Sequence, residues 1–496
     1  MALGAAPAGA GAGVAAGAAA GAAAAHKAAG ATDEAQRARE ASLKGKRLLF
    51  VGGDFMYKGF APSLVRLLQR LRALGVVIHG VFQARPEGPS KYFRDQEAGG
   101  CFDHHTFADI GAEAGAENVA AAVRSAGWDV QYAYSMHDST QLIVAKVQEL
   151  LGMPGNPVAA YEVARDKYAA RKCLERAGLA TIQAMQVWKA EDADEVARRI
   201  GFPAIIKPTV GMGSAGVYRC NDKAELVANI NRLFGDIKTD WALNRNTIGK
   251  QAPVLAETCV IPTLFGGGRV NEHDVEVLMW DGECVYANII DNWTTRPPYF
   301  QEVASNMPTL MDAEQQRAMI DYAIKCVKAM GFTRGGFHTE CWMTPAGPLL
   351  IEVNARVGGG ATVESHVECF GVHPMFEMAM AMMDVPINPP RALEPLCTYG
   401  YLLPNAEVTG ELREDATFLD VAKASPFYYA STYFRKSGPV KGNDTAVAEW
   451  LGEVHLKHGD RDAVLNEMER LLKEISDAAS AQTTPAPKAP VAPAQP

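Results

Sequence analysis

The sequence predicts an α/β protein of several domains, and three observations support this fold class. The chain has 496 residues, 48% of them hydrophobic and 21% charged, which is too long for one compact core. Between residues 47 and 151, short apolar segments alternate with segments of helical periodicity, as in a small parallel sheet covered by helices. Apolar pairs at 273–280 and 284–288, and at 336–342 and 349–353, are joined by turns, which predicts antiparallel hairpins.

Composition and these patterns divide the chain into six segments. Residues 1–45 begin as an almost pure Ala/Gly stretch that buries too little surface to fold. A helix is expected at 161–177, strands at 399–403 and 428–434, and helices at 444–451 and 460–475. The expected order is a tail (1–45), an N-terminal α/β domain (46–160), two segments (161–235 and 236–385), a C-terminal α+β extension (386–476) and a Pro/Ala-rich tail (477–496). The family resemblance described below implies that these two segments are a small lobe and a large lobe.

The charge balance and the cysteines limit which partners and which cellular compartment are expected. A formal charge of −9 with no long basic run argues against nucleic acid and against an anionic membrane surface as partners. Nine dispersed cysteines indicate reduced thiols, and no apolar run is long enough to span a bilayer. We therefore expect a cytoplasmic protein, with organelle targeting by the Ala/Gly segment as the alternative. No acidic residue precedes Asp33, but no arginine precedes Arg37 either.

A lysine stands directly before a glycine-rich stretch in the expected small lobe. Phe202-Pro-Ala-Ile-Ile-Lys207-Pro is followed by the run from Gly211 to Gly216. Such a turn brings free backbone N–H groups and an ammonium together, which suits a polyphosphate. The alternative is an exposed hairpin with a surface lysine. Lys167, on the preceding helix, is a second candidate cation.

Two carboxylates and an amide predict a cation site in the large lobe. Glu352 interrupts an apolar strand, Asn354 lies two residues later on the same face, and Glu340 belongs to the neighbouring strand. Oxygen ligands of this kind suit Mg²⁺ or Mn²⁺ that bridges phosphate oxygens. The alternative is a salt bridge between Glu352 and Arg356.

A weaker signal lies at residues 254–260, an apolar strand containing Glu257, and in the acidic segment that starts at Glu272. Backbone groups at a strand end can read an adenine edge, and a carboxylate can bind ribose hydroxyls. On these residues alone, an ordinary strand and loop is the favoured explanation.

Taken together and in order, these motifs resemble the ATP-grasp superfamily, and within it the carboxylate–amine ligases of the carnosine-synthase and bacterial L-amino-acid-ligase type. The resemblance covers roughly residues 46–385 and implies a preATP-grasp-like N-terminal domain and a two-lobed ATP-grasp domain. Its most specific stretches are D-K-Y-A-A-R from Asp166, F-P-A-I-I-K-P with its glycine loop, E-H-D-V-E-V from Glu272, D-N from Asp291, Phe300, Glu302 and Met307-Pro308 after it, and G-P-L-L-I-E-V-N-A-R-V-G-G from Gly347.

The resemblance also implies roles for single residues. Lys167 and Lys207 resemble the lysines that hold ATP phosphates, and Arg356 the arginine that steadies the transferring phosphate. Glu302 is similar to an acid near the amino-acid substrate, and Gly358 and Gly359 to backbone donors for a carboxylate. The remaining assignments are the phosphate-covering loop (Met212, Gly213, Ser214, Ala215, Gly216), the adenine hinge (Glu257, Thr258, Val260), the ribose acid (Glu272) and the metal ligands (Glu340, Glu352, Asn354).

Two departures leave details open. Residues 263–269 lengthen the segment after the hinge, so the ribose role could shift to Asp274 or Glu276. Ser305 stands where some amino-acid ligases have a histidine, which puts any specific dipeptide product in doubt.

The expected activity is ATP- and Mg²⁺-dependent, ADP-forming amide-bond formation between a small carboxylate and an amine, through an acyl phosphate. The resemblance also suggests a homodimer. The alternatives are an ATP-grasp enzyme of another type, such as a carboxylase, and a nucleotide-binding regulatory protein without catalysis.

Overall fold

The computed structural model describes residues 34–52, 61–211, 216–239, 254–295, 300–443 and 448–486. The expected glycine-loop residues Met212, Gly213, Ser214 and Ala215 therefore lie outside the described residues, as do residues 1–33 and 487–496 of the two expected tails. The first half of the expected tail 477–496 is folded, so that boundary is wrong: α14 extends to Ala481, and β19 follows it.

The N-terminal part is a four-stranded sheet of order β3-β2-β1-β4, and all its strand pairs are parallel. Buried aliphatic side chains of β1 pack against the flanking helices, as the alternating pattern predicts. The strands are β1 (Arg47–Val51), β2 (Val77–Gln83), β3 (His104–Ala108) and β4 (Tyr132–Tyr134), and the helices are α2 (Ala61–Ala73), α3 (Lys91–Ala98), α4 (Gly115–Ser125) and α5 (Asp138–Leu151).

The expected helix at 161–177 is two helices, so that prediction is wrong. Asp166 lies between α6 (Val158–Arg165) and α7 (Lys167–Arg176), in an extended conformation that ends the first helix. Its carboxylate accepts the N–H of Ala169 at 3.0 Å and so caps the second helix. Lys167 becomes the first residue of α7, and its N–H donates to the C=O of Thr209 at 3.1 Å.

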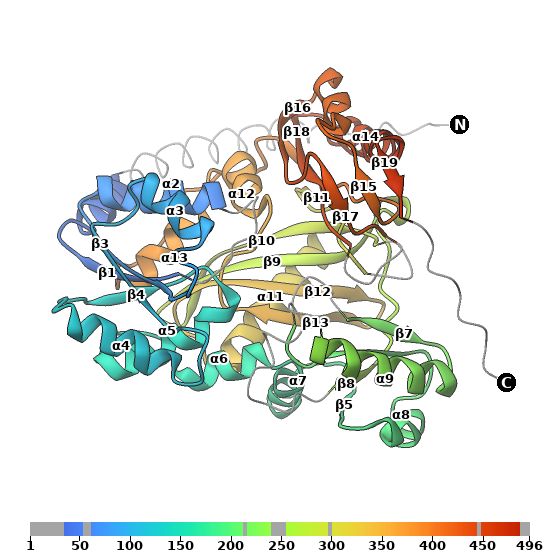
Figure 1. Cartoon of the computed structure of the whole chain (residues 1–496), viewed down its shortest axis with the longest axis horizontal. Helices are drawn as coiled ribbons and strands as arrows, with labels where there is room; N and C mark the ends of the chain where they lie inside the picture. The colour runs from blue at the N-terminus through green and yellow to red at the C-terminus, as the bar shows by residue number, and fades with distance from the viewer. Residues whose placement is uncertain are drawn as a thin grey trace, which may run out of the picture.

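A second four-stranded sheet, antiparallel and of order β5-β8-β6-β7, forms the small lobe at the lower right of Figure 1. Its apolar side chains pack against α8 and α9. The elements are β5 (Ala184–Val187), η1 (Ala190–Asp192), α8 (Ala193–Arg199), β6 (Ala204–Pro208), β7 (Tyr218–Cys220), α9 (Lys223–Thr239) and β8 (Val254–Thr258).

The centre of the molecule is an eight-stranded sheet of order β13-β12-β9-β10-β11-β14-β18-β16 (Figure 1). Val277 and Phe337 face a core that α11 completes, whereas Leu278 and Tyr286 face the core of α12 and α13. Helices therefore cover both faces. The central elements are β9 (Val270–Trp280), β10 (Glu283–Trp293), β11 (Ala304–Met307), α11 (Ala313–Ala329), β12 (Gly335–Thr344), β13 (Gly347–Asn354), α12 (Thr362–Phe370) and α13 (Pro374–Met382).

The segment expected as a C-terminal extension continues this same sheet. It contributes β14, β16 and β18, and a small sheet of order β17-β15-β19 lies beside them. The elements are β14 (Thr398–Leu402), β15 (Gly410–Leu412), η3 (Phe418–Ala424), β16 (Tyr428–Tyr433), β17 (Gly438–Val440), β18 (Gly452–His458), α14 (Arg461–Ala481) and β19 (Thr483–Pro485).

The helix expected at 444–451 lies partly outside the described residues, and its described end is not helical. Trp450 instead forms a bridge with Asn405. Its indole N–H donates to the C=O of Glu302 at 2.9 Å, which ties this segment to the middle of the chain.

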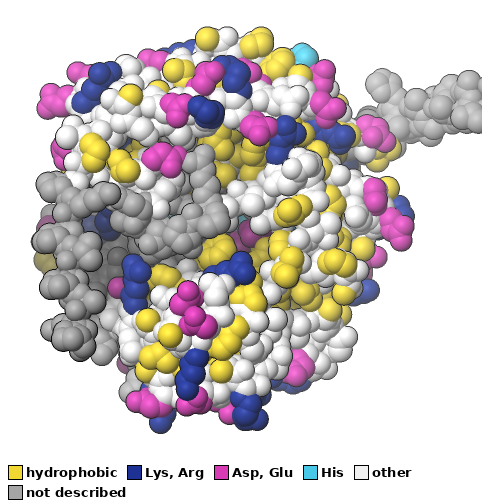
Figure 2. Space-filling model, turned by 90° about the vertical axis from the view of Figure 1, so that its right-hand side faces the viewer, with side chains coloured by type: hydrophobic (Ala, Val, Ile, Leu, Met, Phe, Trp, Pro, Cys, Tyr) yellow, Lys and Arg dark blue, Asp and Glu magenta, His cyan; other side chains and the backbone are white. Residues whose placement is uncertain are grey.

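On the face shown in Figure 2, acidic and basic side chains are interspersed. Within the described ranges, no helix combines the length and apolar character that a bilayer-spanning segment requires.

Candidate active site

The strand register of the large sheet brings polar side chains into two neighbouring rows. Glu340 on β12 is paired with Glu352 on β13 and with Asp274 on β9. Two residues along the same strands, His338 is paired with Asn354 and with Glu276. Residues two apart in a strand point to the same face, so both rows lie on one side of the sheet. We call these six residues the polar rows.

The three expected metal ligands are in direct contact. The side-chain amide of Asn354 donates to Oε1 of Glu340 at 3.2 Å and to Oε1 of Glu352 at 3.1 Å. The ammonium of Lys167, at the start of α7, forms an ion pair with the other oxygen of Glu352. Two regions 185 residues apart in sequence thus meet at one carboxylate.

The two carboxylates of this group differ in their electrostatics. Burial, then the neighbouring Glu352 and Asp274, raise the pKa of Glu340 well above its usual value. Burial also acts to raise the pKa of Glu352, but Lys167, Asn354 and Lys207 outweigh it and lower this pKa to about 2.

Lys207 is the penultimate residue of β6 and is held by a buried series of ion pairs. Its ammonium lies 2.6 Å from Oε2 of Glu257, and Oε1 of Glu257 accepts from Arg171 at 2.9 Å. Arg171 also donates to the C=O of Ile351 on β13 at 2.8 Å, so this series of ion pairs joins the small lobe to the large sheet. Burial lowers the pKa of Lys207 despite the attraction of Glu257. The alternative of a surface lysine is wrong, because Lys207 is only 5% exposed.

The Glu257 carboxylate is fully engaged by these two cations, so of the hinge only backbone groups remain for a ligand. Glu257 and Thr258 end β8, and Val260 lies in the loop that follows. Ile261 and Leu264 in this loop are strongly exposed apolar side chains.

Arg356 does not pair with Glu352, which was the alternative considered from the sequence. It donates to both carboxylate oxygens of Asp138, at 2.8 and 2.9 Å, and to the C=O of Val357 at 3.0 Å. Asp138 belongs to the first turn of α5, in the N-terminal domain. Burial lowers the pKa of Arg356, but Asp138 raises it more, so the net shift is upward.

His338 and Asp138 are functional candidates that the sequence did not reveal. His338 bonds through Nδ1 to Glu276, and its Nε2 lies 3.7 Å from Asp274 and 3.6 Å from Glu340. Burial lowers its pKa, but Asp274 and Glu276 raise it more, to about 9. The sequence signal that could have pointed to His338 is its position two residues before Glu340 on the same strand. Asp138 offered no such signal, since its partner is 218 residues away.

Of the three acids considered for a ribose, Glu272 is the most accessible. Glu276 is fully buried, and Asp274 is 7% exposed and accepts from Asn292 at 2.8 Å. Burial, and then Asp274 and Glu302, raise the pKa of Glu272 to about 8. Glu302 is exposed and lies beside this group.

Asp291, in the D-N motif, makes hydrogen bonds that hold other parts of the fold together. It is fully buried and accepts from His273 at 2.9 Å, Thr309 at 2.5 Å and the N–H of Leu310 at 2.6 Å. Asp291 therefore holds the segment after β11 in place, while its neighbour Asn292 reaches the polar rows.

The two glycines that follow β13, Gly358 and Gly359, have different surroundings. The N–H of Gly358 donates to Glu276 at 3.2 Å, so it is not free for a substrate carboxylate. Gly359 has open space where a side chain would begin. Gly216, the described end of the glycine loop, has φ of 74°, a conformation that favours glycine.

The donor set fits a hard divalent cation. In the described part of the chain, no group of three His, Cys, Asp or Glu side chains is arranged to hold a metal. Mg²⁺ typically takes one or two carboxylates and completes its shell with phosphate oxygens and water. Oδ1 of Asp274 is buried without a hydrogen-bond partner, and Glu340 is crowded by acids. A cation beside Glu340, Glu352 and Asn354 would attract the unpartnered oxygen of Asp274 and would offset the repulsion between Glu340 and the neighbouring acids.

Residues 200–364, which include Lys207 and the strands of the polar rows, match the family described as ATP-grasp domain. Over these residues, the chain is similar to ATP-grasp domains. The structure is also similar to that of an L-amino acid ligase from Bacillus licheniformis, with a TM-score of 0.69 at 19% identity, covering 87% of this chain and 98% of that one. The ATP-grasp fold expected from the sequence is therefore confirmed.

Curated relatives that are similar to this chain include a synthase and a ligase. Carnosine synthase 1 of Gallus gallus is 26% identical over 330 residues, which are 65% of this chain and 33% of that protein. Alanine–anticapsin ligase of Bacillus subtilis (strain 168) is 30% identical over 248 residues, 49% of this chain and 51% of that protein. The aligned region thus spans a third to a half of these relatives. The resemblance to the carboxylate–amine ligase branch is confirmed.

Proposed function

We propose that this chain is an ATP-dependent, ADP-forming carboxylate–amine ligase that makes an amide bond between two small, amino-acid-like substrates. The observation that carries the proposal is the meeting of both candidate phosphate lysines with the acidic group. Lys167 pairs with Glu352, and Lys207 is joined through Glu257 and Arg171 to the C=O of Ile351, the residue before Glu352. The relatives named as synthase and ligase support the same activity.

In this proposal, ATP phosphates displace Glu352 from Lys167 and extend toward Lys207. The glycine loop covers them, the backbone of the Glu257–Val260 hinge reads adenine, and Glu272 binds ribose. Glu340, Glu352 and Asn354 would hold Mg²⁺ or Mn²⁺, which neutralises phosphate charge during transfer. Two lysines, one arginine and a cation together provide the charge that phosphoryl transfer requires.

The reaction has two steps. A substrate carboxylate oxygen attacks the γ-phosphorus, the bond to the β-phosphate oxygen breaks, and ADP leaves. The amine then attacks the acyl carbon of the resulting acyl phosphate; inorganic phosphate leaves with the electron pair, and the nitrogen loses a proton. Arg356 lies within reach of the polar rows and would steady the negative oxygens in both steps, and Glu302 and Gly359 would orient the amino-acid groups.

An ADP-release assay over pairs of amino acids tests the proposal, with the amide product followed by mass spectrometry. A ligase releases ADP only when a carboxylate and an amine substrate are both present. ADP release that depends on bicarbonate instead would identify a carboxylase-type enzyme. No ADP release with any pair, despite nucleotide binding, would contradict the proposal and favour a regulatory protein.

A further inference from the structure

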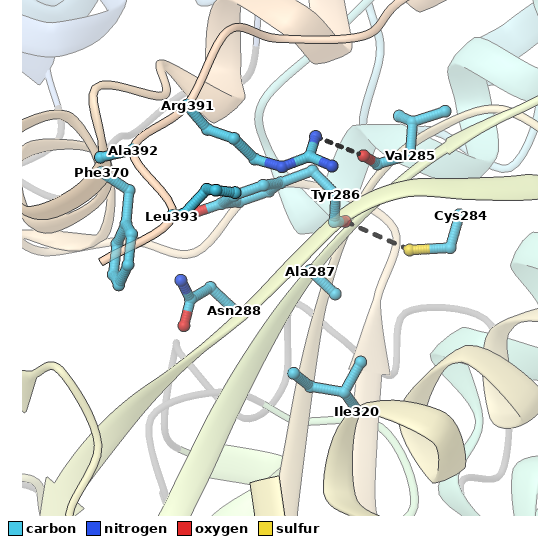
Figure 3. Close-up of a pocket in the computed structure, with 10 residues that line it drawn as sticks. All are labelled: Cys284, Val285, Tyr286, Ala287, Asn288, Ile320, Phe370, Arg391, Ala392 and Leu393. Carbon is cyan, nitrogen blue, oxygen red and sulfur yellow. Dashed lines mark hydrogen bonds between the residues drawn. The ribbon is translucent and has the colours of Figure 1, made fainter. Parts of the chain in front are cut away.

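A cavity of about 330 Å³ lies along β10, outside the polar rows (Figure 3). Its walls come from β10, α11, the end of α12 and the segment that leads from α13 to β14. This volume is in the range of small-molecule binding sites. The residues that matter here are Ala287, Asn288, Ile320, Phe370, Arg391 and Leu393.

Among the described strands, none pairs with one side of β10 along the cavity. β10 pairs with β9 over most of its length, but with β11 only at Asp291 and Asn292. The N–H of Ile289 donates to the side chain of its own neighbour Asn288, at 2.8 Å. Peptide groups two residues apart point to the same edge of a strand, so Ala287 turns its N–H and C=O toward the free side. A free strand edge can pair with an extended peptide group.

A cation stands at the end of this edge. Arg391 donates to the C=O of Val285 at 3.0 Å, and Figure 3 shows its guanidinium beside the strand. Among the described residues, no carboxylate lies within ion-pair distance of Arg391, although a guanidinium has further N–H donors to offer. The N–H of the next residue, Ala392, donates to the C=O of Phe370 at 3.0 Å, which fixes the segment.

Apolar side chains complete the cavity. Phe370 and Ile320 come from opposite faces of the sheet, and Leu393 is 78% exposed beside them. The cavity thus combines a fixed cation, a peptide-like edge and apolar walls.

We propose that this cavity binds a short peptide-type carboxylate, that is, an N-acylated amino acid or a dipeptide. The carboxylate pairs with Arg391, the amide group with the backbone of Ala287, and the side chain packs against Phe370, Ile320 and Leu393. Ala287 is paired with Val277 of β9, whereas its neighbour Asn288 is paired with Glu276, so the cavity lies next to the polar rows but contains none of their six residues.

Isothermal titration calorimetry of the full chain with N-acetyl-L-leucine tests the proposal. N-acetyl-L-leucinamide, which lacks the carboxylate, is the matched ligand. Arg391→Met is the variant, and Arg413→Met, at another exposed arginine, is its control. Loss of a charged hydrogen-bonding pair is expected to weaken binding about tenfold or more, both for the amide and for Arg391→Met. Arg413→Met should bind as the unaltered protein does.

A second variant, Ala287→Pro, removes only an N–H on the free edge, where proline is tolerated. It is expected to weaken N-acetyl-L-leucine binding severalfold, and ADP release should be unchanged in both variants. No binding of N-acetyl-L-leucine to the unaltered protein, or undiminished binding by whichever of the two variants keeps the unaltered melting temperature, would overturn the proposal.

Discussion

Glu352 illustrates how single residues of the site depend on one another. Its carboxylate is bound by Lys167 and Asn354, and its neighbour Glu340 accepts from the same amide and lies 3.6 Å from Nε2 of His338. Such an arrangement is costly to fold unless the charges find partners. A nucleotide with its metal would provide partners for both carboxylates.

Glu352→Ala is expected to lower the rate of ATP-dependent ligation by about 10²-fold or more, because a charge partner of the phosphoryl-transfer transition state is lost. Lys207→Ala is expected to have an effect of the same order. Lys172→Ala, at a more exposed lysine on the helix that carries Lys167, is the control. The measurement is ADP release under saturating substrates, and full activity in either site variant would contradict the assignment.

Glu377 on α13 makes stability depend on pH. It is 3% exposed, and burial raises its pKa to about 7 from a usual value of 4.5. The folded chain thus holds this proton more tightly than the unfolded chain does. The stability it contributes is fully present below pH 4.5 and is lost as the pH rises through 7.

Glu377→Gln cannot ionise, so it is expected to exceed the unaltered protein in free energy of unfolding by roughly 2–3 kcal/mol at pH 8. This difference should shrink toward zero near pH 5. Urea unfolding at a series of pH values measures it, with the exposed Glu394→Gln as control. A difference that does not vary with pH would show that burial of this carboxyl is not the cause.

At the scale of elements, the turn after β13 places a backbone N–H against a buried acid. A Cβ added at Gly358 would lie 2.5 Å from Thr362, 2.6 Å from His338 and 2.8 Å from Glu276, whereas one at Gly359 would meet nothing within 4 Å. The two adjacent glycines therefore make a matched pair.

Gly358→Ala is expected to destabilise the fold by about 1–3 kcal/mol, since three packed groups would have to move. It should also reduce ligation, because His338 and Glu276 belong to the polar rows. Gly359→Ala should change stability by less than about 0.5 kcal/mol. Denaturant unfolding and ADP release measure both effects, and equal behaviour of the two variants would refute this account of the turn.

Several elements could be predicted because their signals are local. The strand at 47–51 and the strand ending at Lys207 are short apolar runs bounded by turn residues. The break between α6 and α7 was missed, because continuous helical periodicity hid the cap at Asp166. Only the contact of Lys167 with Thr209 and Glu352 shows why the chain turns there.

At the scale of the whole molecule, Arg356 and Asp138 connect the N-terminal domain to the large sheet. The pair is bidentate and mostly buried, with side-chain exposures of 16% and 24%. It fixes the position of a proposed catalytic arginine from a separate domain.

Asp138→Asn is expected to lower the free energy of unfolding by about 1–3 kcal/mol, because a hydrogen-bonded charge pair loses one partner. Asp129→Asn removes a pair with Arg47 in which the acid is 83% exposed, so about 0–1 kcal/mol is expected there. Chemical unfolding of both variants provides the comparison. Equal losses would mean that the Arg356 pair adds no more than a surface contact.

Residues 386–476 were expected to form an extension, yet β14, β18 and β16 continue the large sheet. β14 pairs with β11, so Leu402 lies opposite Ala304, 98 residues earlier in the chain. Alternation in a sequence predicts that a strand exists, but it does not name the partner of that strand.

The sequence by itself determined the alternating α/β framework, and it singled out the two candidate phosphate lysines and the Glu/Glu/Asn group, because these signals lie in short stretches of periodicity and residue chemistry. Only the tertiary structure decided which side chains neutralise one another: Glu257 with Lys207 and Arg171, Arg356 with Asp138, and His338 with Glu276. Charges buried together must be paired wherever the fold brings them close. Those pairings depend on strand register and domain contact, which sequence spacing does not record.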